Sequence, residues 1–262
     1  MKKTAELTTQ QLITIIILIV SFGVLLFFIF RLNLGGDVTN KEICHNSVLM
    51  KSKSKIGGSA LDCRTNYICI SGGGKCEGFS ATDTVEIDMG GTDDDRKNRI
   101  MKAIADEMAD CWWMFGEGKV DYVGLDVKGT AIGGIKCVLC SRIKFESSLK
   151  TISISSNELE TFLLKNEKSK SVSYSSYLYG VNDVNKFDVS AVDLNNEYII
   201  FTGIGDLGLL KKTANWFASG FDAFNAFFAI TPKFGGQGLI PVKLVKQSEM
   251  SNEDCTEFLT KA

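Results

Sequence analysis

Proline, histidine and concentrated charge are all scarce in this chain of 262 residues. The 2 prolines argue against a proline-rich stalk or linker. The 1 histidine, His45, severely limits a Ser-His-Asp triad or a multi-histidine metal site. The net charge is −2 and the 29 basic residues are scattered, so nothing indicates nucleic-acid binding. No N-x-[ST] sequon, P-loop or internal repeat occurs either.

One long segment, Leu12–Phe30, has no charge at all. Its sequence is LITIIILIVSFGVLLFFIF, and its only non-apolar residues are Thr14, Ser21 and Gly23. At about 1.5 Å per residue it spans roughly the hydrocarbon core of a bilayer, and it exceeds the usual apolar part of a cleaved signal peptide. We therefore predict a transmembrane helix over 12–30 whose partner is the lipid bilayer, with a cytoplasmic N-terminus over 1–11.

The cysteines all follow this apolar segment, and their number is even. They are Cys44, Cys63, Cys69, Cys76, Cys111, Cys137, Cys140 and Cys255. An even set confined to the part after an anchor indicates disulfide bonds formed in an oxidising compartment. This pattern predicts an extracytoplasmic location for the part after the anchor, and it leaves the pairing open.

The N-terminal sequence KKTAELTTQQLITIIILIV combines a lysine pair, an acidic residue in a short polar stretch and a long apolar helix. Over the first 30 residues this resembles the class III signal segment of archaeal type IV pilin-like proteins. The matching positions are Lys2, Lys3, Glu6 and Leu12–Phe30. In that family the polar stretch marks a peptidase site, and the helix serves as a membrane anchor or filament core. The resemblance implies a membrane-anchored surface protein.

The exposed part is predicted to be α+β. We expect a linker over 31–41, a cysteine-rich subdomain over 42–90 and the main domain over 91–262. Thr92 and three aspartates predict a helix over 93–115 whose apolar face includes Cys111.

The later part of the main domain alternates short helices and strands. The capping-box sequence SSNE predicts a helix over 155–166, and segments 120–127 and 135–145 read as a β-hairpin. EYIIFT and LIPVKLV predict two further strands, and Ser251 is expected to cap a last short helix carrying Cys255. The serine-rich stretch with Tyr174, Tyr177 and Tyr179 is read as a strand and turn, or as an exposed aromatic patch.

The sequence IKCVLC holds the most suggestive pair, Cys137 and Cys140. Structural disulfides are the favoured interpretation. Residues three apart on a regular strand face opposite sides, so each cysteine would seek a different partner. Half a zinc site is an alternative, and Cys111, Cys255 or His45 would have to complete it. A redox-active dithiol is another, although such pairs prefer a helix N-terminus.

Two further patterns bear on ligands and partners. GIGDLG places Gly203, Gly205 and Gly208 in the spacing of a dinucleotide-binding turn, but Asp206 would put negative charge where pyrophosphate binds. We therefore expect a glycine-rich turn and no cofactor. The Phe-rich segment 209–229 reads as a helix that packs in the core or docks on a protein partner or a second copy.

These patterns favour a membrane-anchored cell-surface or envelope protein with a structural or protein-interaction role over an enzyme. The alternatives are a membrane-tethered thiol–disulfide oxidoreductase using Cys137 and Cys140, and a zinc-binding domain.

Overall fold

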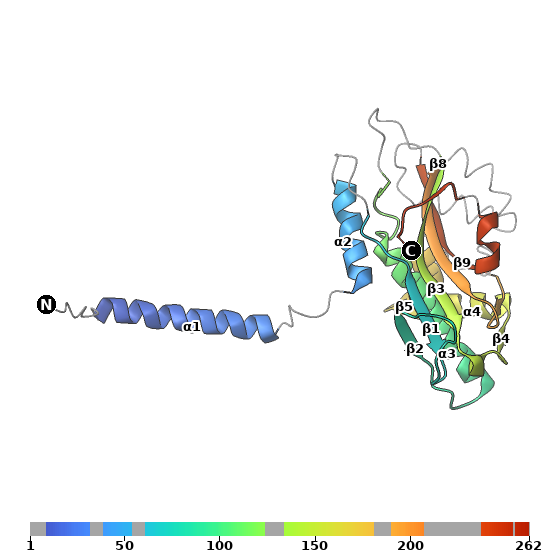
Figure 1. The fold of residues 1–262 in the computed structure, drawn as a ribbon, viewed down its shortest axis with the longest axis horizontal. Coiled ribbons are helices and arrows are strands. Elements are labelled where there is room, and N and C mark those ends of the chain that lie inside the picture. The colour runs from blue at the N-terminus through green and yellow to red at the C-terminus, as the bar shows by residue number, and fades with distance from the viewer. Residues whose placement is uncertain are drawn as a thin grey trace. The chain divides into compact units, whose positions relative to one another are not determined.

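The computed structural model describes residues 9–31, 39–53, 61–123, 134–180, 190–206, 237–253 and 255–261. The chain divides into two compact units, Met1–Thr39 and Asn40–Ala262. Within the described residues, the second unit combines helices with a six-stranded sheet (Figure 1). It also contains four disulfides. The predicted α+β class is therefore confirmed.

The first unit contains helix α1, Thr9–Arg31. Its 23 residues give a length of about 35 Å. The large apolar side chains described between Ile13 and Phe27 are exposed, from 37% at Leu26 to 66% at Ile19. Among the described residues, no helix is found that has both the length and the hydropathy required to cross a membrane. This finding does not support the span expected over 12–30, which stays a proposal.

The second unit begins directly with a helix. Its helices are α2 (Asn40–Lys53), α3 (Asp93–Met114), α4 (Ser156–Lys165) and α5 (Tyr174–Tyr179), with 3-10 turns η1 (Ser147–Leu149) and η3 (Gln247–Asn252). Its longer strands are β1 (Asn66–Ser71), β2 (Asp83–Glu86), β3 (Ile135–Phe145), β8 (Tyr198–Asp206) and β9 (Gln237–Lys246). The short strands are β4 (Ser153–Ile154), β5 (Glu167–Ser169), β6 (Val172–Ser173), β7 (Val192–Asp193) and β10 (Glu257–Phe258).

The main sheet has the order β2-β1-β3-β8-β9, and β3 is its centre. β8 runs antiparallel to β3, whereas β1 and β10 run parallel to it. β10 pairs with β3 at Lys136 and Cys137, and β8 pairs with β3 at the same two residues. Because β8 occupies one edge of β3 there, β10 must lie along the other edge, where β1 pairs further along the strand. A bridge between Arg64 and Lys261 connects the segment before β1 to the C-terminal segment.

Helix α3 packs against one face of this sheet and supplies much of the main core. Thr92 and Asp95 form a capping box at its start, as the sequence predicts. Its apolar stripe includes Ile100, Ile104 and Met108, which are fully buried. A smaller cluster covers the opposite face of the sheet around Cys137, Phe201 and Ile240. β3 is therefore covered on both faces, and its apolar residues are interrupted at Lys136, Ser141, Arg142 and Lys144.

Residues 42–90, predicted as a cysteine-rich subdomain, lie in the same compact unit as the residues that follow them, and β1 pairs directly with β3. The expected linker over 31–41 overlaps α2, which starts at Asn40. The sequence did not predict helix α2, because only two of its residues, Cys44 and Val48, are buried and they form no apolar stripe.

The predicted hairpin is wrong where the structure describes it. Residues 120–123 form no strand, and β3 pairs with β1, β8 and β10 instead. Residues 124–127 lie outside the described residues. The expected last helix is the 3-10 turn η3, which ends at Asn252, so Cys255 follows it in an irregular segment.

Three other predicted elements, one helix and two strands, are confirmed. A capping box of Ser155 and Glu158 opens α4, and EYIIFT and LIPVKLV lie in β8 and β9.

Candidate functional site

All eight cysteines form disulfides, which confirms the prediction of disulfide bonds. Cys140 pairs with Cys111 of α3 inside the main core, whereas Cys137 pairs with Cys255 in the cluster on the opposite face. The two cysteines of IKCVLC therefore face opposite sides of β3, as the strand periodicity predicts. Together they fasten the central strand to a helix on one side and to the C-terminal segment on the other.

The other two disulfides fasten the segments before and after β1. Cys44 of α2 pairs with Cys63, and Cys69 of β1 pairs with Cys76. With every sulfur bonded to another, none is a thiolate ligand, so the zinc alternative at Cys137, Cys140 and Cys111 has no support. Across the described ranges, no group of three His, Cys, Asp or Glu residues is placed to hold a metal ion.

The redox alternative has no support either. An active dithiol must cycle between a disulfide within the pair and two thiols. Cys137 and Cys140 are bonded to different partners, and their exposed fractions are 0% and 1%. An attacking thiolate would not reach them without opening the core.

The glycine-rich turn expected at 203–208 is not present where the structure describes it. Gly203 and Gly205 lie within β8, which runs on through Asp206. A Cβ at Gly203 would lie 2.6 Å from the carbonyl oxygen of Lys136, so this glycine allows close approach of β3. Gly208 and the Phe-rich segment 209–229 lie outside the described residues.

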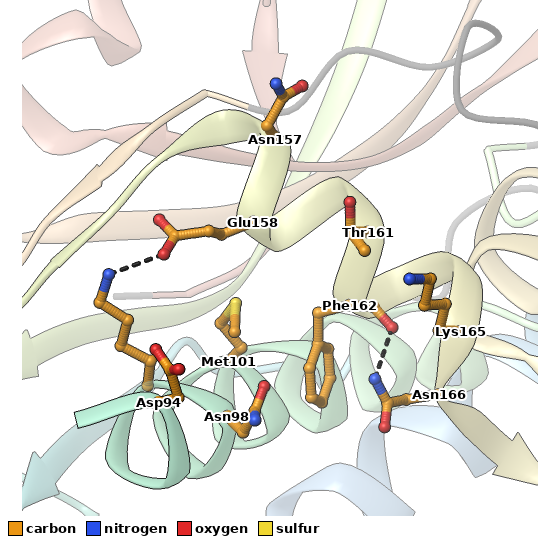
Figure 2. A pocket seen from close by; sticks show the side chains of 10 residues that line it. Asp94, Asn98, Met101, Asn157, Glu158, Thr161, Phe162, Lys165 and Asn166 are labelled. Atoms are coloured by element: carbon orange, nitrogen blue, oxygen red, sulfur yellow. Dashed lines mark hydrogen bonds and ion pairs between the residues drawn. The ribbon is translucent and has the colours of Figure 1, made fainter. Parts of the chain in front are cut away.

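A cleft between α3 and α4 is the best candidate for a functional site (Figure 2). Its volume is about 450 Å³, within the usual range of small-molecule sites. Helix α3 contributes Asp94, Lys97, Asn98 and Met101. Helix α4 and its C-cap contribute Asn157, Glu158, Thr161, Phe162, Lys165 and Asn166.

The local sequence explains why these side chains face each other. Asp94, Asn98 and Met101 follow one another at helical steps of four and three along α3, and Asn157, Thr161 and Lys165 do so at steps of four along α4. Met101 and Phe162 point into the space between the helices and close the cleft floor (Figure 2). Both are largely buried, and the atoms they leave accessible give the cleft an apolar floor between its polar side chains.

One ion pair crosses the cleft. Lys97 Nζ donates to Glu158 Oε1 at 2.6 Å. The hydrogen bond from Lys97, followed by those from the backbone and hydroxyl of Ser155, lowers the pKa of Glu158 to about 2. The same bond to Glu158 raises the pKa of Lys97. The pair therefore stays ionised at neutral pH and holds the two helices at a fixed separation.

The lining of the cleft combines amides, one hydroxyl, two carboxylates and two lysines. The side chains of Asn98, Asn157 and Thr161 make no hydrogen bond within the described part of the chain. The sequence alone did not reveal this site, because the two halves are separated by a span longer than either helix.

A second polar cluster lies where α3 meets α2, β5 and α5. Lys41 bridges Glu107 and Asp110 at 2.7 and 2.8 Å, and Lys168 reaches Asp110 and Asp106 at 3.8 and 3.7 Å. Burial alone would lower the pKa of Lys41, but Glu107 and Asp110 outweigh it and raise that pKa. The two lysines of the cluster bridge the acidic residues of α3, and these ion pairs connect α3 to α2 and β5.

The tyrosines expected in a strand or a surface patch belong to this helical junction. Tyr174 and Tyr177 lie in α5, and their hydroxyls donate to Asp106 and Glu117 at 2.5 and 2.8 Å. Burial and these carboxylates raise the pKa of both phenols well above 10. The lone histidine, His45, is half-buried and stacks on Trp113 with ring centroids 4.0 Å apart.

Comparison of the chain with protein-family models, curated proteins and solved structures finds no match. Function is therefore argued from the residues and the geometry of this chain.

Proposed function

We propose that the chain is a membrane-anchored extracytoplasmic protein with a structural or protein-interaction role at the cell surface or envelope. The observation that carries the proposal is the complete pairing of the cysteines in the unit Asn40–Ala262. Disulfides persist in oxidising compartments and are rare in a reducing cytosol. Four of them in one unit fit a domain that folds outside the cytoplasm.

The anchor is proposed from the N-terminal unit. The run Leu12–Phe30 carries no charge, and α1 contains it in one continuous helix. The side chains of Leu12, Phe28, Ile29 and Phe30 are outside the part that the structure describes, so these four positions enter the proposal through their sequence alone. Large apolar side chains exposed along such a helix need a partner other than water, and lipid supplies one.

The pilin-like character is proposed from the resemblance over the first 30 residues. In such a role, α1 would serve as a membrane anchor or pack against other copies. The absence of a thiol pair at Cys137 and Cys140 favours this role over that of an oxidoreductase.

A topology experiment tests the proposal. The 16 Leu, Ile, Val and Phe residues of the run favour insertion by about 5–10 kcal/mol in total, whereas one arginine in the run costs about 2.5–3.5 kcal/mol. The test variant therefore carries Ile16→Arg, Val20→Arg and Val24→Arg together. We expect this variant to be released from membranes at alkaline pH, while Gln10→Arg outside the run stays bound. Protease added to intact cells should digest the domain of the unchanged protein. Membrane association that survives the three substitutions, or a domain protected from protease, would contradict the proposal.

A further inference from the structure

The cleft between α3 and α4 has a lining whose chemistry selects among ligand classes. Its charged side chains are Asp94 and Glu158 against Lys97 and Lys165, so their formal charges sum to zero. Lys97 and Glu158 already neutralise each other across the cleft. A single remaining lysine is a weak basis for binding phosphate, a nucleotide or another polyanion.

The backbone at the helix starts is not offered to a ligand either. Thr92 with Asp95, and Ser155 with Glu158, form capping boxes that occupy amides at the N-termini of α3 and α4. Each capping box occupies two of the free amides at its helix start, which leaves fewer of them to bind an anion. An extended peptide that binds by strand addition requires an open sheet edge, whereas this cleft is lined by side chains of two helices. The cleft therefore does not suit that mode of peptide binding.

The hydrogen-bonding groups left over are neutral for the most part. Asn98 on α3 and Asn157 and Thr161 on α4 have no side-chain partner within the described residues. An amide presents a donor and an acceptor together, and a hydroxyl does the same with one atom. The exposed Asp94 and Lys165 add one acceptor and one donor, but water screens their charge.

We infer that this cleft binds a neutral carbohydrate. Vicinal hydroxyl groups donate and accept at neighbouring positions, which matches the paired donors and acceptors of the two asparagines and the threonine. The volume of about 450 Å³ suits a small glycan unit, and Met101 and Phe162 provide an apolar floor for ring C–H groups. This inference goes beyond the proposed function and does not depend on the anchor or the compartment.

Binding is tested with the full chain in a sugar-free zwitterionic detergent, which requires no membrane insertion and, unlike a glycoside detergent, does not compete for the cleft. The probes are glucose, galactose, N-acetylglucosamine and maltose, followed by saturation-transfer NMR and titration calorimetry. The cleft variant is Asn98→Ala with Thr161→Val, which removes two hydrogen-bonding groups with little change in volume at Thr161. The matched control is Asn46→Ala, an exposed asparagine on α2 outside the cleft.

We expect at least one of these sugars to bind the unchanged protein. Its affinity for the cleft variant should be lower by roughly tenfold or more, and its affinity for the control should be unchanged. Far-ultraviolet circular dichroism and disulfide mapping establish that each variant is folded. Lys97→Met provides a second variant, which should weaken binding by loosening the α3–α4 separation. No binding by any sugar, equal binding by the cleft variant, or preference for glycine, trialanine or glucose 6-phosphate would overturn the inference.

Discussion

The ion pair between Lys41 and Glu107 is the clearest place to test how α2 is fixed to the domain. Lys41 Nζ lies 2.7 Å from Glu107 and 2.8 Å from Asp110, and Ser141 Oγ donates to the other oxygen of Glu107 at 3.0 Å. The Glu107 side chain is 7% exposed and that of Lys41 is 21% exposed. Replacing Lys41 by methionine keeps most of the apolar stem and leaves a buried carboxylate with its hydroxyl partner alone.

Breaking a buried ion pair on one side costs about 3–5 kcal/mol, and the partial exposure of Lys41 reduces this to about 2–3 kcal/mol. Lys102→Met is the control, because Lys102 is 62% exposed and pairs with Asp106 on the same helix. That change should cost about 0.3–0.5 kcal/mol. Urea unfolding followed by tryptophan fluorescence measures both values.

A double-mutant cycle separates the pair from the single substitutions. Glu107→Gln retains an acceptor for Ser141 and removes the buried charge, so Lys41→Met with Glu107→Gln should be more stable than Lys41→Met alone. The reasoning is refuted if Lys41→Met costs no more than Lys102→Met, or if the second substitution gives no recovery.

Three other predictions follow from the fold. Cys137–Cys255 has a sequence separation of 118, and in the chain-entropy model its removal should destabilise the protein by about 4–5 kcal/mol. Cys69–Cys76 has a separation of 7, and its removal should cost only about 2 kcal/mol. Urea unfolding of variants with both cysteines of a pair replaced by alanine measures the two values. The pKa of Glu158 is about 2, so its contribution is present above its ordinary pKa near 4.5 and lost as the pH falls toward 2. Glu158→Gln should therefore flatten the acid side of the stability profile by about 1 kcal/mol, a small value because the carboxylate is 38% exposed. Gly203→Ala should lower the free energy of unfolding by about 1–3 kcal/mol, because the new Cβ would lie 2.6 Å from the Lys136 carbonyl oxygen. A variant as stable as the unchanged protein would contradict this, since it would show that β3 and β8 can move apart at that position.

Elements with strong local signals were predictable from the sequence. Helix α3 has a capping box and a long apolar stripe, and α4 has a second capping box. The opposite orientation of Cys137 and Cys140 followed from strand periodicity alone.

What the sequence did not reveal depends on contacts between distant segments. Helix α5 is six residues long, and its tyrosines bind Asp106 and Glu117, which are 68 and 60 residues away. β3 pairs in parallel with β1 and β10, whereas local reasoning favoured the nearest segment as a hairpin partner. The cleft was missed for the same reason, because each helix supplies only half of its lining.

Disulfide mapping of the unreduced protein tests the central claim most directly. Thiols are blocked during lysis of the native host, and the digested peptides are identified by mass spectrometry before and after reduction. We predict no free thiol, with Cys137 linked to Cys255 and Cys140 linked to Cys111. Reactive thiols at these positions, or a bond joining Cys137 to Cys140, would contradict the account of an oxidised, structurally fastened domain outside the cytoplasm.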